Sequence, residues 1–171
     1  MIFILGSPRT GSTLIYQFLI DIYNLSFFNN LTNNYFYKYP FIGTYVSQLF
    51  SPNIKYESNH GKTKGLLEPS EGSNIFMNWF ESSNNILSDK RKNILKTFEN
   101  IDKYISKPIV TKNAWNCFRI KTLTKLFPNI KFVWIKGHNG DTYNEVADRL
   151  ANEVEYTNTD EYYEMGRSIL L

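Results

Sequence analysis

Short apolar runs alternate along the chain with longer segments that are apolar at helical spacing. Residues 1–5 are all apolar, which is typical of a buried parallel strand, and residues 12–23 have the periodicity of a helix that packs on a sheet. The same patterns predict further strands at 25–28, 109–111 and 130–135, and helices at 88–105, 117–127 and 142–155, with another after Pro40 within 35–50. This alternation predicts an α/β fold, a three-layer sandwich with a mostly parallel sheet.

The segment Gly6-Ser-Pro-Arg-Thr-Gly-Ser-Thr13 joins the first predicted strand to the first predicted helix. Backbone N–H groups in such a loop can surround an anion, and the positive end of the helix dipole faces it. The two glycines and Thr13 fit the phosphate-loop pattern G-x-x-x-x-G-K-[ST], except that Ser12 stands where the lysine belongs. ATPase chemistry loses its main charge clamp without that lysine. We therefore predict a P-loop-like anion cradle with Arg9 as its cation; the alternative is an ordinary strand-to-helix turn.

Composition narrows the class of protein. The 171 residues are enough for one domain with a proper core, and a net charge of +3 is too small to indicate a nucleic acid or an anionic membrane surface as partner. The single cysteine, Cys117, excludes an intrachain disulfide and suits a reducing compartment. No apolar stretch has the length of a membrane span, and the N-terminus lacks the pattern of a signal peptide. We expect a cytoplasmic protein without a membrane partner.

Residues 4–14 resemble the 5′-phosphosulfate loop of sulfotransferases that use 3′-phosphoadenosine 5′-phosphosulfate (PAPS). Residues 65–72 and 107–133 extend the resemblance, which covers about residues 1–135; within 107–133 they are similar to the family's central strand, helix and following strand. The resemblance implies transfer of a sulfuryl group from PAPS to a hydroxyl or amine of an unknown small-molecule or glycan acceptor. It implies no required metal. Because known members are longer, it also predicts a chain truncated relative to the family.

The resemblance assigns residues to this reaction. It implies that the cofactor is bound by residues of the phosphate loop and by one lysine at the end of a strand: Gly6, Ser7, Arg9, Thr10, Gly11, Ser12, Thr13 and Lys112. An acceptor hydroxyl needs a general base nearby, and Glu68 and Glu71 are the candidates because residues 65–72 resemble an acceptor-side loop. His60 is a third candidate. The alternative is that both glutamates are ordinary loop acids.

Residues 134–153 resemble the last strand, loop and final helix of ribonuclease H, so that 134–155 would form a strand-loop-helix tail on a single domain of residues 1–171. That resemblance implies a loop role for His138 and a metal-binding role for Asp148 in Mg²⁺-dependent hydrolysis of nucleic acid. Such a site needs several carboxylates, and the first strand contains none. Two alternatives to an active sulfotransferase therefore stay open: a ribonuclease H-type fragment, and a recombined domain that folds without catalysing a reaction.

Overall fold

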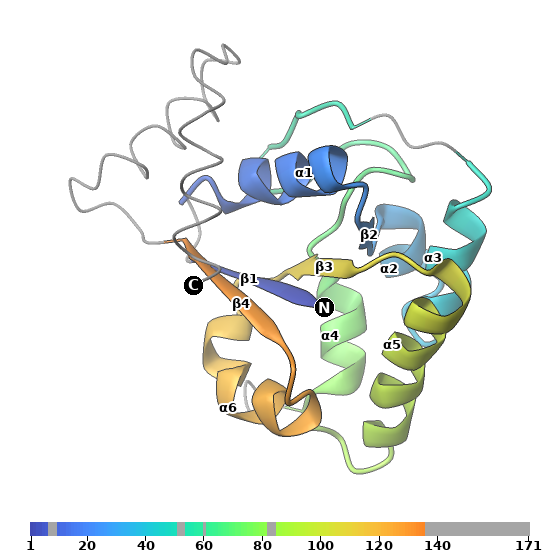
Figure 1. Cartoon of the computed structure of the whole chain (residues 1–171), viewed down its shortest axis with the longest axis vertical. Coiled ribbons are helices and arrows are strands. Elements are labelled where there is room, and N and C mark those ends of the chain that lie inside the picture. Colours follow the sequence, from blue (N-terminus) through green and yellow to red (C-terminus); the bar gives the residue numbers. More distant parts are fainter. Residues whose placement is uncertain (7–9, 51–53, 60, 82–84, 136–171) are drawn as a thin grey trace.

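A computed structural model describes residues 1–6, 10–50, 54–59, 61–81 and 85–135 (Figure 1). Four strands form one sheet in the order β2-β3-β1-β4: β1 (Ile2–Gly6), β2 (Ser26–Phe27), β3 (Ile109–Lys112) and β4 (Lys131–Ile135). Every pairing between them is parallel; Ile4 of β1, for example, lies opposite Lys112 of β3 and Val133 of β4. The predicted α/β fold with a parallel sheet is confirmed.

Six helices accompany the strands in the described part of the chain: α1 (Ser12–Tyr23), α2 (Asn30–Tyr35), α3 (Pro40–Ser47), α4 (Ser73–Trp79), α5 (Arg91–Ile105) and α6 (Asn116–Leu126). The first helix has its predicted bounds. Helix α5 begins three residues later than predicted, because residues 88–90 form a turn in which Lys90 N–H donates to the Leu87 carbonyl at 2.8 Å. Helix α4 occupies a segment for which the pattern predicted no helix. The helix predicted at 142–155 lies outside the described residues.

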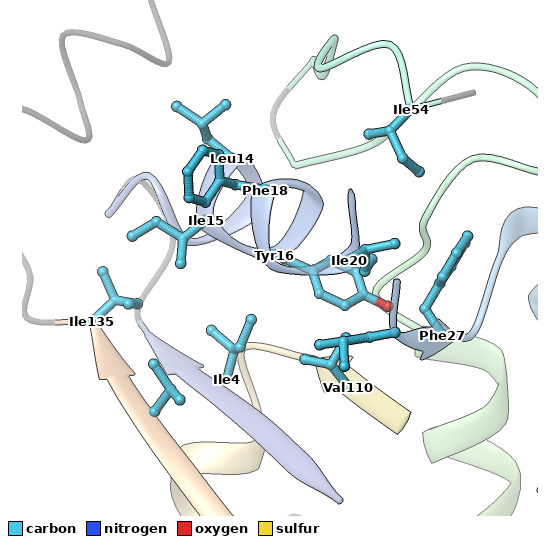
Figure 2. Packing of buried hydrophobic residues seen from close by; sticks show 12 residues of the cluster. Ile4, Leu14, Ile15, Tyr16, Phe18, Ile20, Phe27, Ile54, Val110 and Ile135 are labelled. Carbon is cyan, nitrogen blue, oxygen red and sulfur yellow. The ribbon is translucent and has the colours of Figure 1, made fainter. Parts of the chain in front are cut away.

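The helices cover both faces of the sheet, which gives the three layers (Figure 1). Helix α1 lies on one face, where Ile4 and Val110 of the central strands meet the buried side chains of Tyr16 and Ile20 (Figure 2). Helices α4, α5 and α6 lie on the other face. Successive residues of a strand point to opposite faces, so Phe3 packs on this second side while its neighbour Ile4 packs against α1.

Aromatic rings fill the second face. The rings of Phe28, Phe98 and Trp79 are buried, and each pair of their centroids lies about 6 Å apart, the spacing at which aromatic pairs contribute beyond their buried area. The indole N–H of Trp79 also donates to Oδ1 of Asn93 on α5 at 3.0 Å. These contacts fix α4 against α5, and they thereby fix the loop that leads into α4.

The parallel arrangement brings several segments to one edge of the sheet. Because all four strands run in the same direction, the loop after β1, the start of α2 after β2, and Lys112 at the end of β3 all lie at the carboxyl edge. Ligands of open α/β sheets bind at this edge. The candidate site is therefore built from segments that are far apart in the sequence.

Candidate functional site

The phosphate loop runs from the end of β1 to the start of α1. A Cβ atom at Gly6 would lie 2.9 Å from Oγ1 of Thr10 and 3.2 Å from Cβ of Ser12, so the backbone here is packed too tightly for a side chain. Gly11 adopts a left-handed conformation (φ 70°) directly before α1, and no side chain caps that helix. Within the described residues, the first N–H groups of α1 therefore donate no hydrogen bond to a capping side chain, as an anion cradle requires.

Lys112 places a positive charge beside this loop. The strand pairing sets β3 next to β1, and the lysine stands at the last position of β3 with only 5% of its surface exposed. Its ammonium donates a hydrogen bond to Oγ1 of Thr13 at 2.9 Å. The phosphate-loop pattern has a lysine at the position of Ser12. In this chain a lysine from the neighbouring strand, Lys112, contacts the following residue, Thr13.

Glu71 completes a three-residue cluster with Lys112 and Thr13. Its carboxylate forms an ion pair with the Lys112 ammonium, and its backbone carbonyl accepts a hydrogen bond from Nδ2 of Asn113 at 3.1 Å. Gly61, with a φ of 79°, lies so close that a Cβ there would be 2.7 Å from Oε1 of Glu71. Lys112 thus holds the carboxylate of Glu71, Asn113 holds its backbone, and Gly61 packs closely against Oε1, while the side chain stays partly exposed to solvent.

Two buried side chains, Tyr16 and Arg119, donate hydrogen bonds to residues that neighbour Glu71 and Lys112 in the chain. The hydroxyl of Tyr16 donates to the Ser70 carbonyl at 3.3 Å, next to Glu71. Burial and the charge of Glu71 raise the pKa of Tyr16 above its usual range, so the phenol stays protonated. The second group is Arg119, which donates to Oδ1 of Asn113 at 3.1 Å. Asn113 therefore connects a buried guanidinium to the backbone of Glu71.

Arg119 was not identified from the sequence as a site residue. Its guanidinium carbon lies 4.6 Å from the ring centroid of Phe80 and 5.2 Å from that of Phe76, and burial lowers its pKa to about 10. It is still a cation at neutral pH. No described carboxylate forms an ion pair with it. The sequence shows only that an arginine lies within the helix α6. The pattern of the helix does not reveal which residues that arginine contacts.

The structure treats the two predicted glutamates differently. Glu71 reaches Lys112, whereas Glu68 is 7% exposed and its atom Oε2 has no hydrogen-bond partner among the described residues. Burial raises the pKa of the Glu68 carboxyl, although the backbone N–H and the charge of Lys55 oppose this shift. The backbone carbonyl of Glu68 accepts a hydrogen bond from the N–H of Asn30, the first residue of α2, at 3.1 Å.

Several predicted site residues lie outside the described residues: Ser7, Arg9, His60, His138 and Asp148. Within the described ranges no group of three or more histidine, cysteine, aspartate and glutamate side chains could hold a metal ion. The same part of the chain contains no helix that is long and apolar enough to cross a membrane.

A sequence model of the sulfotransferase family matches residues 2–167. The chain belongs to the sulfotransferase family. The match extends through the segment at 134–153, and the resemblance of that segment to ribonuclease H finds no support in the comparisons. No curated protein and no solved structure matches the chain. The family assignment therefore rests on the sequence pattern, and it agrees with the α/β fold and the parallel sheet described above.

Proposed function

We propose that this sulfotransferase uses PAPS as its donor and transfers the sulfuryl group to a hydroxyl or amine acceptor. The observation that carries the proposal is the position of Lys112, whose ammonium contacts both Thr13 of the phosphate loop and the carboxylate of Glu71. A cation between an anion-binding loop and a carboxylate suits a reaction in which an anionic group passes to an acceptor that must lose a proton.

The described part of the loop fits the 5′-phosphosulfate of PAPS. Among the described residues no side chain caps the start of α1, so its first backbone N–H groups can donate to anionic oxygens, and the close packing at Gly6 keeps the backbone free of a side chain there. The Thr13 hydroxyl accepts its hydrogen bond from Lys112, so its own proton is available to the ligand. In this proposal the cofactor is held by Gly6, Ser7, Arg9, Thr10, Gly11, Ser12, Thr13 and Lys112.

The reaction moves one sulfuryl group and one proton. When bound, PAPS supplies the sulfuryl group, and the bridging phosphate oxygen keeps the electron pair of the sulfur–oxygen bond that breaks. The acceptor oxygen or nitrogen forms the new bond to sulfur and gives up its proton to the Glu71 carboxylate. Lys112 offsets negative charge on the oxygens between the loop and Glu71. Glu68 is the second candidate base. Comparing the transfer rates of Glu68→Gln and Glu71→Gln shows which of the two carboxylates acts as the base.

Binding of 3′-phosphoadenosine 5′-phosphate (PAP), measured by calorimetry on the full chain, tests the donor site. We expect PAP to bind with a dissociation constant of about 1 μM or below, and adenosine 5′-monophosphate to bind more weakly. Arg9→Ala should abolish PAP binding because the loop loses its only arginine. Arg91→Ala, at the exposed start of α5, is the matched control and should bind PAP normally. If PAP fails to bind the native chain, the proposal is wrong.

Catalysis is measured separately, as transfer of ³⁵S from labelled PAPS to an acceptor. Glu71→Gln should lower the transfer rate by about 10² to 10⁴. Glu68→Gln should leave it within about twofold, since the Glu68 side chain makes no contact with Lys112 in the structure. The reverse ranking of these two variants would assign the base to Glu68.

A further inference from the structure

A cavity of about 640 Å³ opens beside the cluster of Glu71, Lys112 and Thr13. Helix α2, the segment 61–66 and the start of α4 form its walls, and Glu71 and Gly61 belong both to these walls and to the cluster. Helix α2 begins just after β2 ends, so the cavity lies at the carboxyl edge of the sheet beside the end of β3. An acceptor in this cavity would lie next to the carboxylate that we propose as its base.

The walls of this cavity are polar. Twelve described residues line it, and nine of them have polar or charged side chains; two of the others are glycines, and Leu66 alone has an apolar side chain. No aromatic ring belongs to the described lining, although the chain has 13 phenylalanines and 12 tyrosines. Pockets for small molecules are usually lined by hydrophobic and aromatic side chains, so this composition indicates an acceptor that offers hydrogen bonds in place of flat apolar surface.

Internal hydrogen bonds hold the polar walls in place. Nδ2 of Asn30 donates to the carbonyls of Gly65 at 2.8 Å and Thr63 at 3.1 Å, which ties the segment 61–66 to α2. Asn74 at the start of α4 donates two hydrogen bonds to Asn33 of α2, from its backbone N–H to Oδ1 at 2.9 Å and from Nδ2 to the backbone carbonyl at 3.2 Å. Groups fixed in this way lose little entropy when a ligand binds.

Other polar groups of the lining are free to meet a ligand. The ammonium of Lys62, the hydroxyl of Ser73 and Nδ2 of Asn34 donate no hydrogen bond to another described residue. Ammonium, hydroxyl and amide groups together offer donors and acceptors at several points of the wall. A flat phenol or a sterol would leave these groups without partners, and a polar group buried in that way costs free energy.

We infer that the acceptor of this enzyme is a polyhydroxylated molecule of the carbohydrate class, bound in this cavity with one hydroxyl directed to Glu71. The inference rests on the proposed sulfotransferase activity. It goes beyond that activity because a sulfotransferase with the same donor loop could equally carry an apolar pocket for phenols. The choice between these acceptors is made by the residues of α2, 61–66 and the start of α4.

The test compares two acceptor panels under identical conditions. Transfer of ³⁵S from PAPS is measured with neutral oligosaccharides built from glucose, galactose and N-acetylglucosamine, and with phenols such as 4-nitrophenol and 2-naphthol. We expect transfer to at least one oligosaccharide at a kcat/KM at least tenfold above that of any phenol. Lys62→Met and Asn34→Leu should each raise KM for that oligosaccharide by about tenfold without changing PAP binding. Lys64→Met, an exposed neighbour outside the cavity lining, is the matched control and should leave KM unchanged.

The outcomes separate the inference from the function on which it rests. If PAP does not bind the native chain, the proposed function fails. If PAP binds and the phenols are the better acceptors, the function stands and the carbohydrate inference is overturned. If PAP binds but neither panel is sulfated, the proposed transfer and the carbohydrate inference both fail. If an oligosaccharide is sulfated but its KM is the same in Lys62→Met, Asn34→Leu and Lys64→Met, the acceptor does not bind in this cavity, which also overturns the inference.

Discussion

Replacing Lys112 by methionine tests whether the cluster beside the phosphate loop stabilises the fold. Methionine keeps much of the length and apolar surface of the lysine stem but removes the ammonium. The variant therefore loses the 2.9 Å hydrogen bond to Thr13 and the ion pair with Glu71. It also leaves the Glu71 carboxylate without its cation.

The expected loss of stability follows from the burial of the two partners. Breaking a fully buried ion pair costs about 3–5 kcal/mol, because the remaining charge has no partner. The Lys112 side chain is 6% exposed, but that of Glu71 is 28% exposed, so water can solvate the carboxylate that is left. We therefore expect Lys112→Met to lower the free energy of unfolding by about 2 kcal/mol. Glu71→Gln should also cost about 2 kcal/mol, because a glutamine oxygen still accepts from the ammonium but the more deeply buried Lys112 loses its counter-charge.

Urea denaturation followed by tryptophan fluorescence measures the stability lost in each single variant. Trp79 is buried in the core, so its fluorescence reports the exposure of the core on unfolding. The double variant should lose less than the sum of the single variants, with a coupling energy of about 1 kcal/mol. Lys121→Met, on the exposed side of α6, is the control and should change stability by less than about 0.5 kcal/mol. If the losses of the two single variants add, or if Lys112→Met behaves like the control, the ion pair does not stabilise the fold and our argument is wrong.

Two further predictions concern the buried charged groups. The raised pKa of Glu68 means that the folded protein holds this proton more tightly than the unfolded chain, so its contribution to stability is present at acidic pH and is lost as the pH rises through the raised value. Glu68→Gln should therefore gain stability relative to the native protein in urea titrations as the pH rises from the ordinary glutamate pKa through the raised pKa of Glu68; a pH-independent difference would contradict this. Arg119→Met should lower the free energy of unfolding by about 2–4 kcal/mol, because it removes hydrogen bonds to Asn113 and Asn116 and the cation over two rings, whereas Arg91→Met should change it by less than about 0.5 kcal/mol. Equal losses in the two arginine variants would show that the buried contacts contribute nothing.

Local patterns in the sequence were enough to predict the fold class and the phosphate loop. An apolar strand, a loop with two glycines and an amphipathic helix lie within residues 1–23, so their order in the chain is also their order in space. The resemblance to sulfotransferases added the prediction that the loop binds PAPS, and the family match confirms the family. The helices α2 and α4 were missed because each has fewer than eight residues, too few to show a helical period.

The composition of the site depended on the tertiary structure. The pattern of the chain predicts parallel strands but does not give the order in which they pair. Placing β3 next to β1 brings Lys112 to Thr13, 99 positions away, and it brings Glu71, but not the side chain of Glu68, to the same ammonium. Two glutamates three positions apart in one loop are equivalent in a sequence pattern. Only the packing of the loop against the end of β3 decides that one forms an ion pair while the other is buried without a hydrogen-bond partner for its Oε2 among the described residues.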